Sequence, residues 1–174
     1  MKKFSLFTIA LFISLFVVAQ QSAVDKLFEK YGGKDGYTTV SINKGMFDML
    51  NEMDPEDEDL KALAQIEYVR VLAVEDEEMI KGVNFYDEIM KSLNVEEYEE
   101  LMTVKQSDQD VKILVKQTGS IIQELLIVVG GEDNALVYIK GNIQLKDLSG
   151  LSHGFPIHGL EALKALEGID EEIH

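Results

Sequence analysis

The second half of the chain carries the pattern that most constrains the fold. From Tyr98 onwards, apolar and polar residues alternate along several stretches, and short polar or glycine-containing turns separate these stretches. Alternation with a period of two is typical of a β-strand that packs one face on a core. The pattern predicts strands over residues 101–105, 110–118, 121–129 and 134–145. Turns at intervals of roughly 8–12 residues predict an antiparallel meander, because short turns join strands that run in opposite directions.

The first half of the chain is richer in helical patterns. A helix is predicted over Ala23–Tyr31, with Ser22 as its N-cap and Gly32-Gly33 as its stop. Further helices are predicted around residues 46–53, after Asp54, over 85–93 and over Gly159–Leu166, and strands over 37–43 and 67–74. In the last helix, Leu160, Leu163 and Leu166 would point inward. We therefore expect an α+β domain, with one antiparallel sheet of five or six strands, helices packed on one face and the other face partly open.

The N-terminus has the features of a secretory signal peptide. Lys2 and Lys3 precede an apolar run from Phe4 to Val18, which ends at Val17-Val18-Ala19 before polar residues. A positive n-region, a short apolar region and small residues at the cleavage site are typical of such a signal. The run of 15 residues is shorter than the roughly 20 that a membrane-spanning helix needs. We expect cleavage after Ala19, which leaves a single acidic domain over residues 20–174 in the periplasm or outside the cell.

Charge limits the partners of this mature domain. Removing residues 1–19 takes away two of the sixteen basic residues and none of the thirty-two acidic ones, so the formal charge changes from −16 to −18. Nucleic acids and anionic lipid surfaces both need Lys or Arg to compensate their charge, so both are excluded as partners. The chain has no cysteine, which also excludes a lipid anchor attached through that residue. The acidic surface favours solubility, with a basic partner or divalent cations as the alternatives.

The run Asp54-Pro55-Glu56-Asp57-Glu58-Asp59 allows two interpretations. As a helix start, Asp54 is the N-cap, Pro55 occupies the first helical position and the acids face the positive end of the helix dipole. As a calcium loop, it lacks the glycine and the downstream ligands of an EF-hand. We favour the helix start. The acidic group Glu75–Glu78 precedes another predicted helix, and calcium binding at either run remains the alternative.

Two further features allow a structural and a functional interpretation. Arg70, the only arginine, could orient an anionic ligand, but with so many carboxylates in the chain we expect it to form a structural ion pair. Met46, Met49 and Met53 fall on one helical face. Such a stripe could be a soft-metal site or an adaptable binding surface, but its spacing first predicts core packing or a helix contact.

Histidines are the remaining candidate metal ligands. His153 and His158 are five residues apart in a turn that contains Pro156, and His174 is the last residue. Zinc usually takes three or four protein ligands, so a site here would need an unidentified carboxylate. We therefore predict no metal and no cofactor, and interpret the two histidines as incidental. A metal-dependent hydrolase that uses His153 and His158 is retained as an alternative.

Other catalytic signatures are missing from the sequence. It has no cysteine nucleophile, no G-x-S-x-G motif and no serine in a triad context. The pairs Gly32-Gly33 and Gly130-Gly131 do not open the strand-to-helix turn of a phosphate-binding loop, and the second pair predicts a hairpin turn. We accordingly predict no catalytic residues.

Several segments together carry a family resemblance. They are the signal ending Val18-Ala-Gln, the helix that follows Ser22, Val40-Ser-Ile-Asn-Lys-Gly-Met-Phe, the segment Leu136–Leu145 and Gly159-Leu-Glu-Ala-Leu. Across essentially the whole mature chain, the sequence resembles the exported family known as domain of unknown function 4252, found mostly in Bacteroidetes. The resemblance implies a periplasmic or cell-envelope location and no established activity. Many members carry a lipid-attachment cysteine, which this chain lacks, so membrane tethering is not implied.

The leading functional hypothesis is a non-enzymatic binding or interaction module whose partner is an unknown protein or small ligand. Besides the hydrolase, the other alternative is an envelope-stress or structural component that binds a basic partner. The quoted motifs are packing and turn patterns, so the resemblance transfers no functional residue.

Overall fold

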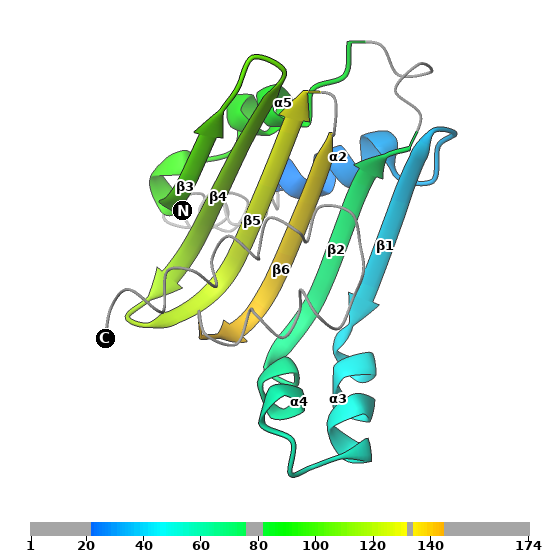
Figure 1. The fold of residues 1–174 in the computed structure, drawn as a ribbon, viewed down its shortest axis with the longest axis vertical. Helices are drawn as coiled ribbons and strands as arrows, with labels where there is room; N and C mark the ends of the chain where they lie inside the picture. Colours follow the sequence, from blue (N-terminus) through cyan, green and yellow to red (C-terminus); the bar gives the residue numbers. More distant parts are fainter. Residues whose placement is uncertain (1–21, 76–81, 132–133, 145–174) are drawn as a thin grey trace, which may run out of the picture.

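The sheet of the computed structural model is six-stranded and antiparallel throughout, with the strand order β1-β2-β6-β5-β4-β3 (Figure 1). The structure describes residues 22–75, 82–131 and 134–144. The strands are β1 Tyr37–Asn43, β2 Ile66–Val74, β3 Glu99–Lys105, β4 Gln109–Thr118, β5 Ile121–Gly131 and β6 Ala135–Ile143. The α+β class, the single antiparallel sheet and the C-terminal meander are therefore confirmed.

Four α-helices and one 3₁₀ turn accompany the sheet in these residues. They are α2 Ala23–Tyr31, α3 Lys44–Met53, α4 Glu58–Leu63, α5 Phe85–Ser92 and η2 Val95–Glu97. Local capping explains where two of them begin. The Ser22 hydroxyl accepts a hydrogen bond from the Asp25 backbone N–H at 3.0 Å, and the Asn84 side chain does the same for Asp87. Both caps satisfy a backbone donor that the first helical turn leaves unpaired.

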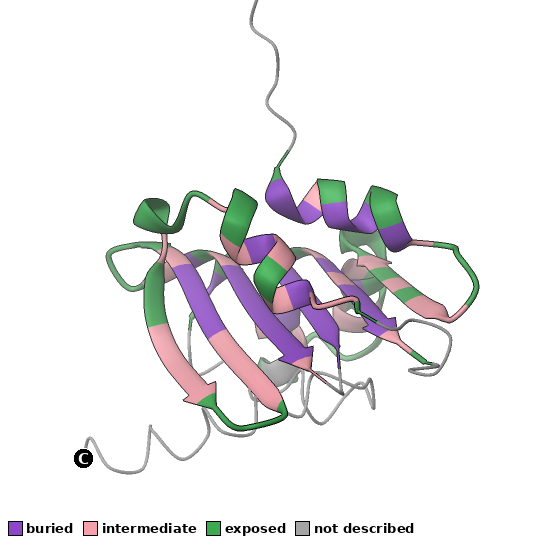
Figure 2. Cartoon of the chain, turned by 90° about the horizontal axis from the view of Figure 1, so that it is seen from above, coloured by how far each residue is buried: buried purple, intermediate pink, exposed green. Residues whose placement is uncertain are grey.

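Helices α2 and α5 cover one face of the sheet (Figure 2). Their apolar sides meet every second residue of the strands, as the alternation in the sequence requires. The core of this layer includes Val24, Leu27, Phe28, Phe85, Ile89, Leu72, Leu126 and Leu136. Each such side chain stabilises the fold by roughly 1.5–3 kcal/mol through burial. This layer fixes both helices on the sheet.

The opposite face of the sheet, here called the second face, is also apolar. Val71, Ile127 and Val137 point to it, and each is at most 1% exposed. Phe47 of α3 and Leu63 of α4 join the same core. The expectation that this face is partly open holds at its edges, where Val40, Ile42 and Met102 are only partly buried, and is wrong over the central strands. The reason is that the central strands are apolar on both of their faces, so both must be buried.

Asn134 ties the turn between β5 and β6 to helix α5. It is the only polar residue of the described ranges that is buried as a whole, with 6% of its surface exposed. Its Oδ1 accepts a hydrogen bond from the Phe85 N–H at 2.9 Å, and its Nδ2 donates to the carbonyl oxygens of Val83 and Gly131 at 3.1 and 2.6 Å. Its backbone carbonyl accepts from the Val74 N–H at 3.0 Å. One residue thus joins β2, β5, β6 and α5.

Replacing Asn134 by Ala should lower the free energy of unfolding by about 2 kcal/mol or more, because the buried Phe85 N–H loses its acceptor. Asn142→Ala is the matched control, since Asn142 is exposed on β6, the strand that follows Asn134, and should change stability by no more than about 0.5 kcal/mol. Urea unfolding followed by circular dichroism measures both variants. Equal stability of the two would contradict the role given to Asn134.

Candidate functional site

The candidate metal ligands of the sequence are only partly covered by the structure. His153, His158 and His174 lie outside the described residues, as do residues 76–78 of the second acidic group. Within the described ranges, no group of three or more His, Cys, Asp or Glu side chains is placed to hold a metal ion. Of the other residues that the sequence analysis singled out for a possible function, the structure describes Arg70, the acidic run that begins at Asp54 and the three methionines.

Arg70 forms the structural ion pair that the sequence predicts. Its Nη1 lies 2.7 Å from Oδ1 of Asp25, and its guanidinium carbon lies 3.8 Å from the centre of the Phe28 ring. Both partners belong to α2, whereas Arg70 belongs to β2. The side chain therefore fastens the first helix to the sheet by a charge-assisted hydrogen bond and a cation–π contact.

A tyrosine–glutamate cluster occupies the same sheet face as α2 and α5. The Tyr98 hydroxyl donates to Oε2 of Glu124 at 2.7 Å, and the Tyr138 hydroxyl interacts with the same carboxylate. The ring of Tyr68 lies edge-on to that of Tyr138, with 5.6 Å between centroids. Burial and the hydrogen bonds to Glu124 raise the pKa of both Tyr98 and Tyr138, so both phenols stay protonated donors. The cluster satisfies its own polar atoms, which is what a structural network requires.

Glu88 has a comparable role between α2 and α5. Its carboxylate accepts hydrogen bonds from Lys30 at 2.8 Å and from Tyr31 at 2.5 Å. Burial opposes its ionisation, but these hydrogen bonds outweigh burial and lower the pKa of Glu88. Contacts between two helices thus explain the lowered pKa of Glu88.

The connection between β1 and β2 is a pair of helices, α3 and α4, that projects from one end of the sheet (Figure 1). Phe47 and Leu63 anchor this hairpin in the core of the second face. Lys44 joins its two arms, because its Nζ donates to Oδ1 of Asp48 at 2.8 Å and to the Ala64 carbonyl at 2.9 Å. These contacts decide which side of α3 turns inward.

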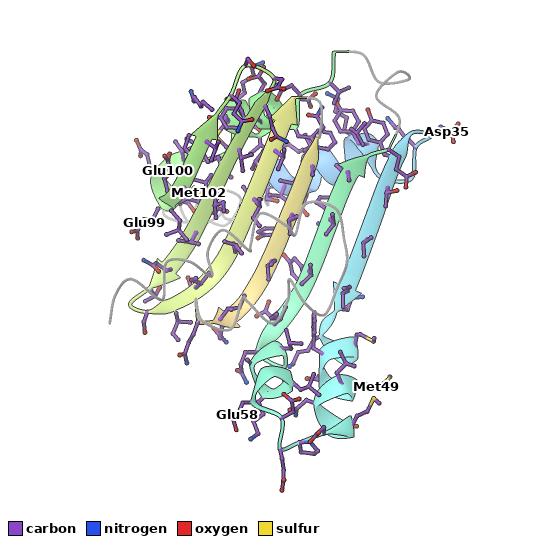
Figure 3. The ribbon with its side chains drawn as sticks, viewed as in Figure 1. Asp35, Met49, Glu58, Glu99, Glu100 and Met102 are labelled. Carbon is purple, nitrogen blue, oxygen red and sulfur yellow. The ribbon has the colours of Figure 1, made fainter. Side chains whose placement is uncertain are left out.

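The methionines lie on the other side of α3. Met46, Met49 and Met53 are 46, 59 and 76% exposed, and the helical repeat places them within about 60° of one another. Figure 3 shows Met49 on the side of α3 that faces away from α4. The spacing predicted core packing or a helix contact, and core packing is wrong, because Phe47 fills the inward position instead. We call these three side chains the methionine face.

Carboxylates border the methionine face. Between residues 44 and 59 the sequence has seven acidic residues and one lysine. Asp48 and Glu52 follow one flank of α3, and the acidic run forms the turn at the end of the hairpin and the start of α4. An apolar stripe next to a dense negative charge is complementary to a segment that is apolar on one side and basic on the other.

The acidic run is a helix start, as predicted, but the cap lies three residues later. Helix α3 continues to Met53, so Asp54 ends that helix and its side chain accepts from the Glu56 N–H. Asp57 Oδ1 then accepts from the Leu60 N–H at 3.2 Å, and α4 begins at Glu58. The chain needs this short turn to reverse direction between the two helices.

One polar atom in the hairpin is buried at a cost. Asn51 Oδ1, on the inward side of α3, has no hydrogen-bond partner among the described residues. Leaving a buried acceptor unpaired costs about 1–3 kcal/mol. Local departures from the most stable arrangement are expected where function shapes a segment. The unpaired acceptor of Asn51 lies on α3, the helix that exposes the methionines.

Calcium should not bind the acidic run, because Asp54 and Asp57 already cap backbone N–H groups. Low-millimolar CaCl₂ should raise the melting temperature no more than NaCl of equal ionic strength, as followed by circular dichroism. A saturable rise would indicate a bound ion. The matched variant is Asp57→Asn with Asp59→Asn, since Asn preserves the cap and removes the charge. A calcium-dependent rise that this variant abolishes would contradict the prediction.

Comparisons with known proteins identify a family and no site. No curated protein and no solved structure matches the chain. A family model, described as Domain of unknown function (DUF4252), matches residues 31–151 and so includes every described strand, helices α3 to α5 and the methionine face. The match covers well over half of the sequence. The chain therefore belongs to the DUF4252 family.

Proposed function

We propose that this protein is an exported, non-enzymatic binding module that docks a basic amphipathic segment of a partner protein on its methionine face. The observation that carries the proposal is the exposure of Met46, Met49 and Met53 on one side of a projecting helix. Three neighbouring large apolar side chains in water favour an apolar contact that covers them. A helix with one apolar side fits such a stripe at spacings of three and four residues.

The chemistry of methionine suits this role. Its unbranched thioether side chain adapts to partners of different shape, because it has three rotatable bonds and a polarisable sulfur atom. The sheet behind the hairpin supplies the rigid part of the module, through the anchors Phe47 and Leu63. The binding surface can therefore adapt in its side chains while its backbone stays in place.

Charge complementarity supports a basic partner. The carboxylates that border the methionine face would attract Lys and Arg side chains and speed the encounter with a basic segment. The same charge disfavours nucleic acids and anionic lipid surfaces. A protein segment with Lys or Arg along one side and apolar residues along the other satisfies both features of the surface.

The absence of enzymatic activity is part of the proposal. Glu88, Tyr98 and Tyr138, three of the described groups whose pKa values are shifted, are engaged in contacts between elements of the fold. A general acid or base must instead be within reach of a substrate. These groups join helices and strands, which supports a binding role.

Export rests on the N-terminal sequence. Lys2-Lys3, the apolar run and Val17-Val18-Ala19 have the order of a cleaved signal. No helix of the described residues is long and apolar enough to span a membrane. We place the mature protein in the periplasm or outside the cell.

Docking can be tested with a synthetic helical peptide of leucine and lysine in which the two residue types occupy opposite sides. Its control is a peptide of the same composition in scrambled order. Fluorescence anisotropy at 0.15 M NaCl should show tighter binding of the amphipathic peptide, because only that peptide presents an apolar stripe. The triple variant Met46→Gln, Met49→Gln, Met53→Gln should weaken this binding about tenfold or more, since about 1.4 kcal/mol corresponds to each factor of ten.

Val95→Gln is the matched control protein, since Val95 is an exposed apolar residue outside the hairpin, and should bind as the wild type does. The triple variant should also keep its stability, because Gln and Met have similar helix propensities. Equal affinity for the two peptides, or no effect of the triple variant, would contradict the proposal.

Export can be tested by expressing the full sequence in a bacterium and measuring the intact mass of the purified protein. The mature chain should begin at Gln20 and fractionate with soluble periplasmic or secreted material. A control with Val17→Lys and Ala19→Lys should keep its leader, because signal cleavage needs small residues at these positions. Retention of residues 1–19 in the unaltered protein would refute the assignment.

A further inference from the structure

The second face of the sheet is buried more completely than the described helices can explain. Leu125, Ile127, Val137 and Ile139 are each at most 1% exposed, and all belong to the central strands β5 and β6. From the described helices, only α3 and α4 contribute to this core, through Phe47, Leu63 and Leu60. They join it at the end of β1 and β2 from which the hairpin projects (Figure 1).

A sheet face needs a second layer to reach this degree of burial. On a bare face, neighbouring side chains cover one another only at their sides, so large apolar residues stay partly exposed. Close-packed cores instead place atoms on every side of a buried residue. Helices α2 and α5 cannot supply the layer, because they pack on the opposite face (Figure 2). The described helices therefore leave the layer over the central strands unaccounted for.

The lengths of the remaining segments, and the points at which they connect to the fold, indicate which segment can form this layer. The chain outside the described ranges consists of residues 1–21, 76–81, 132–133 and 145–174. Residues 1–21 lead into α2, which packs on the opposite face. The ranges 76–81 and 132–133 contain only six and two residues. Residues 145–174 continue shortly after Ile143, which is itself buried in the core of the second face. The 30 residues of this segment would reach about 45 Å as a helix, against about 24 Å across six strands.

We propose that residues 145–174 dock across the second face of the sheet and form its second layer. The sequence of this segment fits the site, because Leu160, Leu163 and Leu166 share one side of the helix expected over Gly159–Leu166. Phe155 and Ile157 add two large apolar side chains just before it. The polar residues between them would face water, which is the pattern of a helix that lies on a sheet.

This docking would divide the molecule into two surfaces with different occupants. The second face is filled from within the chain, and the methionine face on α3 is left for a partner. The inference is independent of the proposed function, because it makes no use of the methionine face or of a partner. It also gives the residues after β6 a structural role in the domain.

Photo-crosslinking of the full chain tests the contact directly. Leucine is replaced during expression by its diazirine analogue, and the cross-linked residues are identified by mass spectrometry after illumination. We expect cross-links from Leu160, Leu163 or Leu166 to Ile127, Val137, Ile139 and their neighbours on the second face. Cross-links of the segment to the opposite face, or no cross-links from it while other leucines react, would overturn the proposal.

A mixture of ¹⁵N-labelled and unlabelled chains separates contacts within one chain from contacts between copies. We expect cross-links that join peptides of the same isotope content only. Mixed-isotope cross-links between the segment and the second face would show that a second copy provides the layer, and would overturn the proposal.

A pair of substitutions gives a second readout. Leu163→Asp places a carboxylate on the inward side of the expected helix, whereas Ala165→Asp places it on the opposite side, so the two have matched charge. Leu163→Asp should raise the fluorescence of the neutral apolar dye Nile red several-fold and lower the melting temperature, while Ala165→Asp should do neither. Equal behaviour of the two variants would contradict the docking.

Discussion

The pairing of β2 with β6 is the interaction on which the rest of the structure depends. It joins two units that are each local in sequence, the β1–β2 pair and the meander β3–β4–β5–β6. The register sets Val69 opposite Ile139 and Val71 opposite Val137, so apolar residues of both strands share one face. The Asn134 carbonyl extends this pairing to Val74, and the Asn134 side chain ties α5 to the adjoining turn. Without the pairing of β2 with β6, the β1–β2 pair and the meander would each expose part of the apolar surface that they bury against one another.

The same topology creates the surface that we assign to binding. Antiparallel neighbours can be joined by a turn of two residues, yet β1 and β2 are joined by the α3–α4 hairpin. The anchored sheet holds the base of this insertion, and Phe47 takes the inward side of α3. The methionines consequently face water next to the carboxylates. A rigid base with adaptable side chains at its end is a sound arrangement for recognising a partner.

Sequence patterns predicted most elements of the fold because their causes are local. Val111, Ile113 and Val115 fall on one side of β4, with Lys112 on the other, as their alternation requires. The cap at Ser22 was predictable for the same reason. The candidate site was predicted less well. Helical spacing showed that Met46, Met49 and Met53 share a side of α3, but the preference for Phe47 as the anchor depends on what the sheet places beneath it. The Tyr98–Glu124–Tyr138 cluster gave no signal in the sequence, because its members come together only when β3, β4, β5 and β6 assemble side by side.

The sequence by itself determined the class of the fold, the strands of the meander, most helix boundaries and the acidic character of the surface. Each of these follows from the residue types within a short window, or from composition. The tertiary structure alone decided the strand order and the side of α3 that meets water. These depend on the β2–β6 pairing between residues about seventy positions apart, and a pattern of period two is satisfied equally well by several orders of strands. Only the packing of the assembled sheet distinguishes among them.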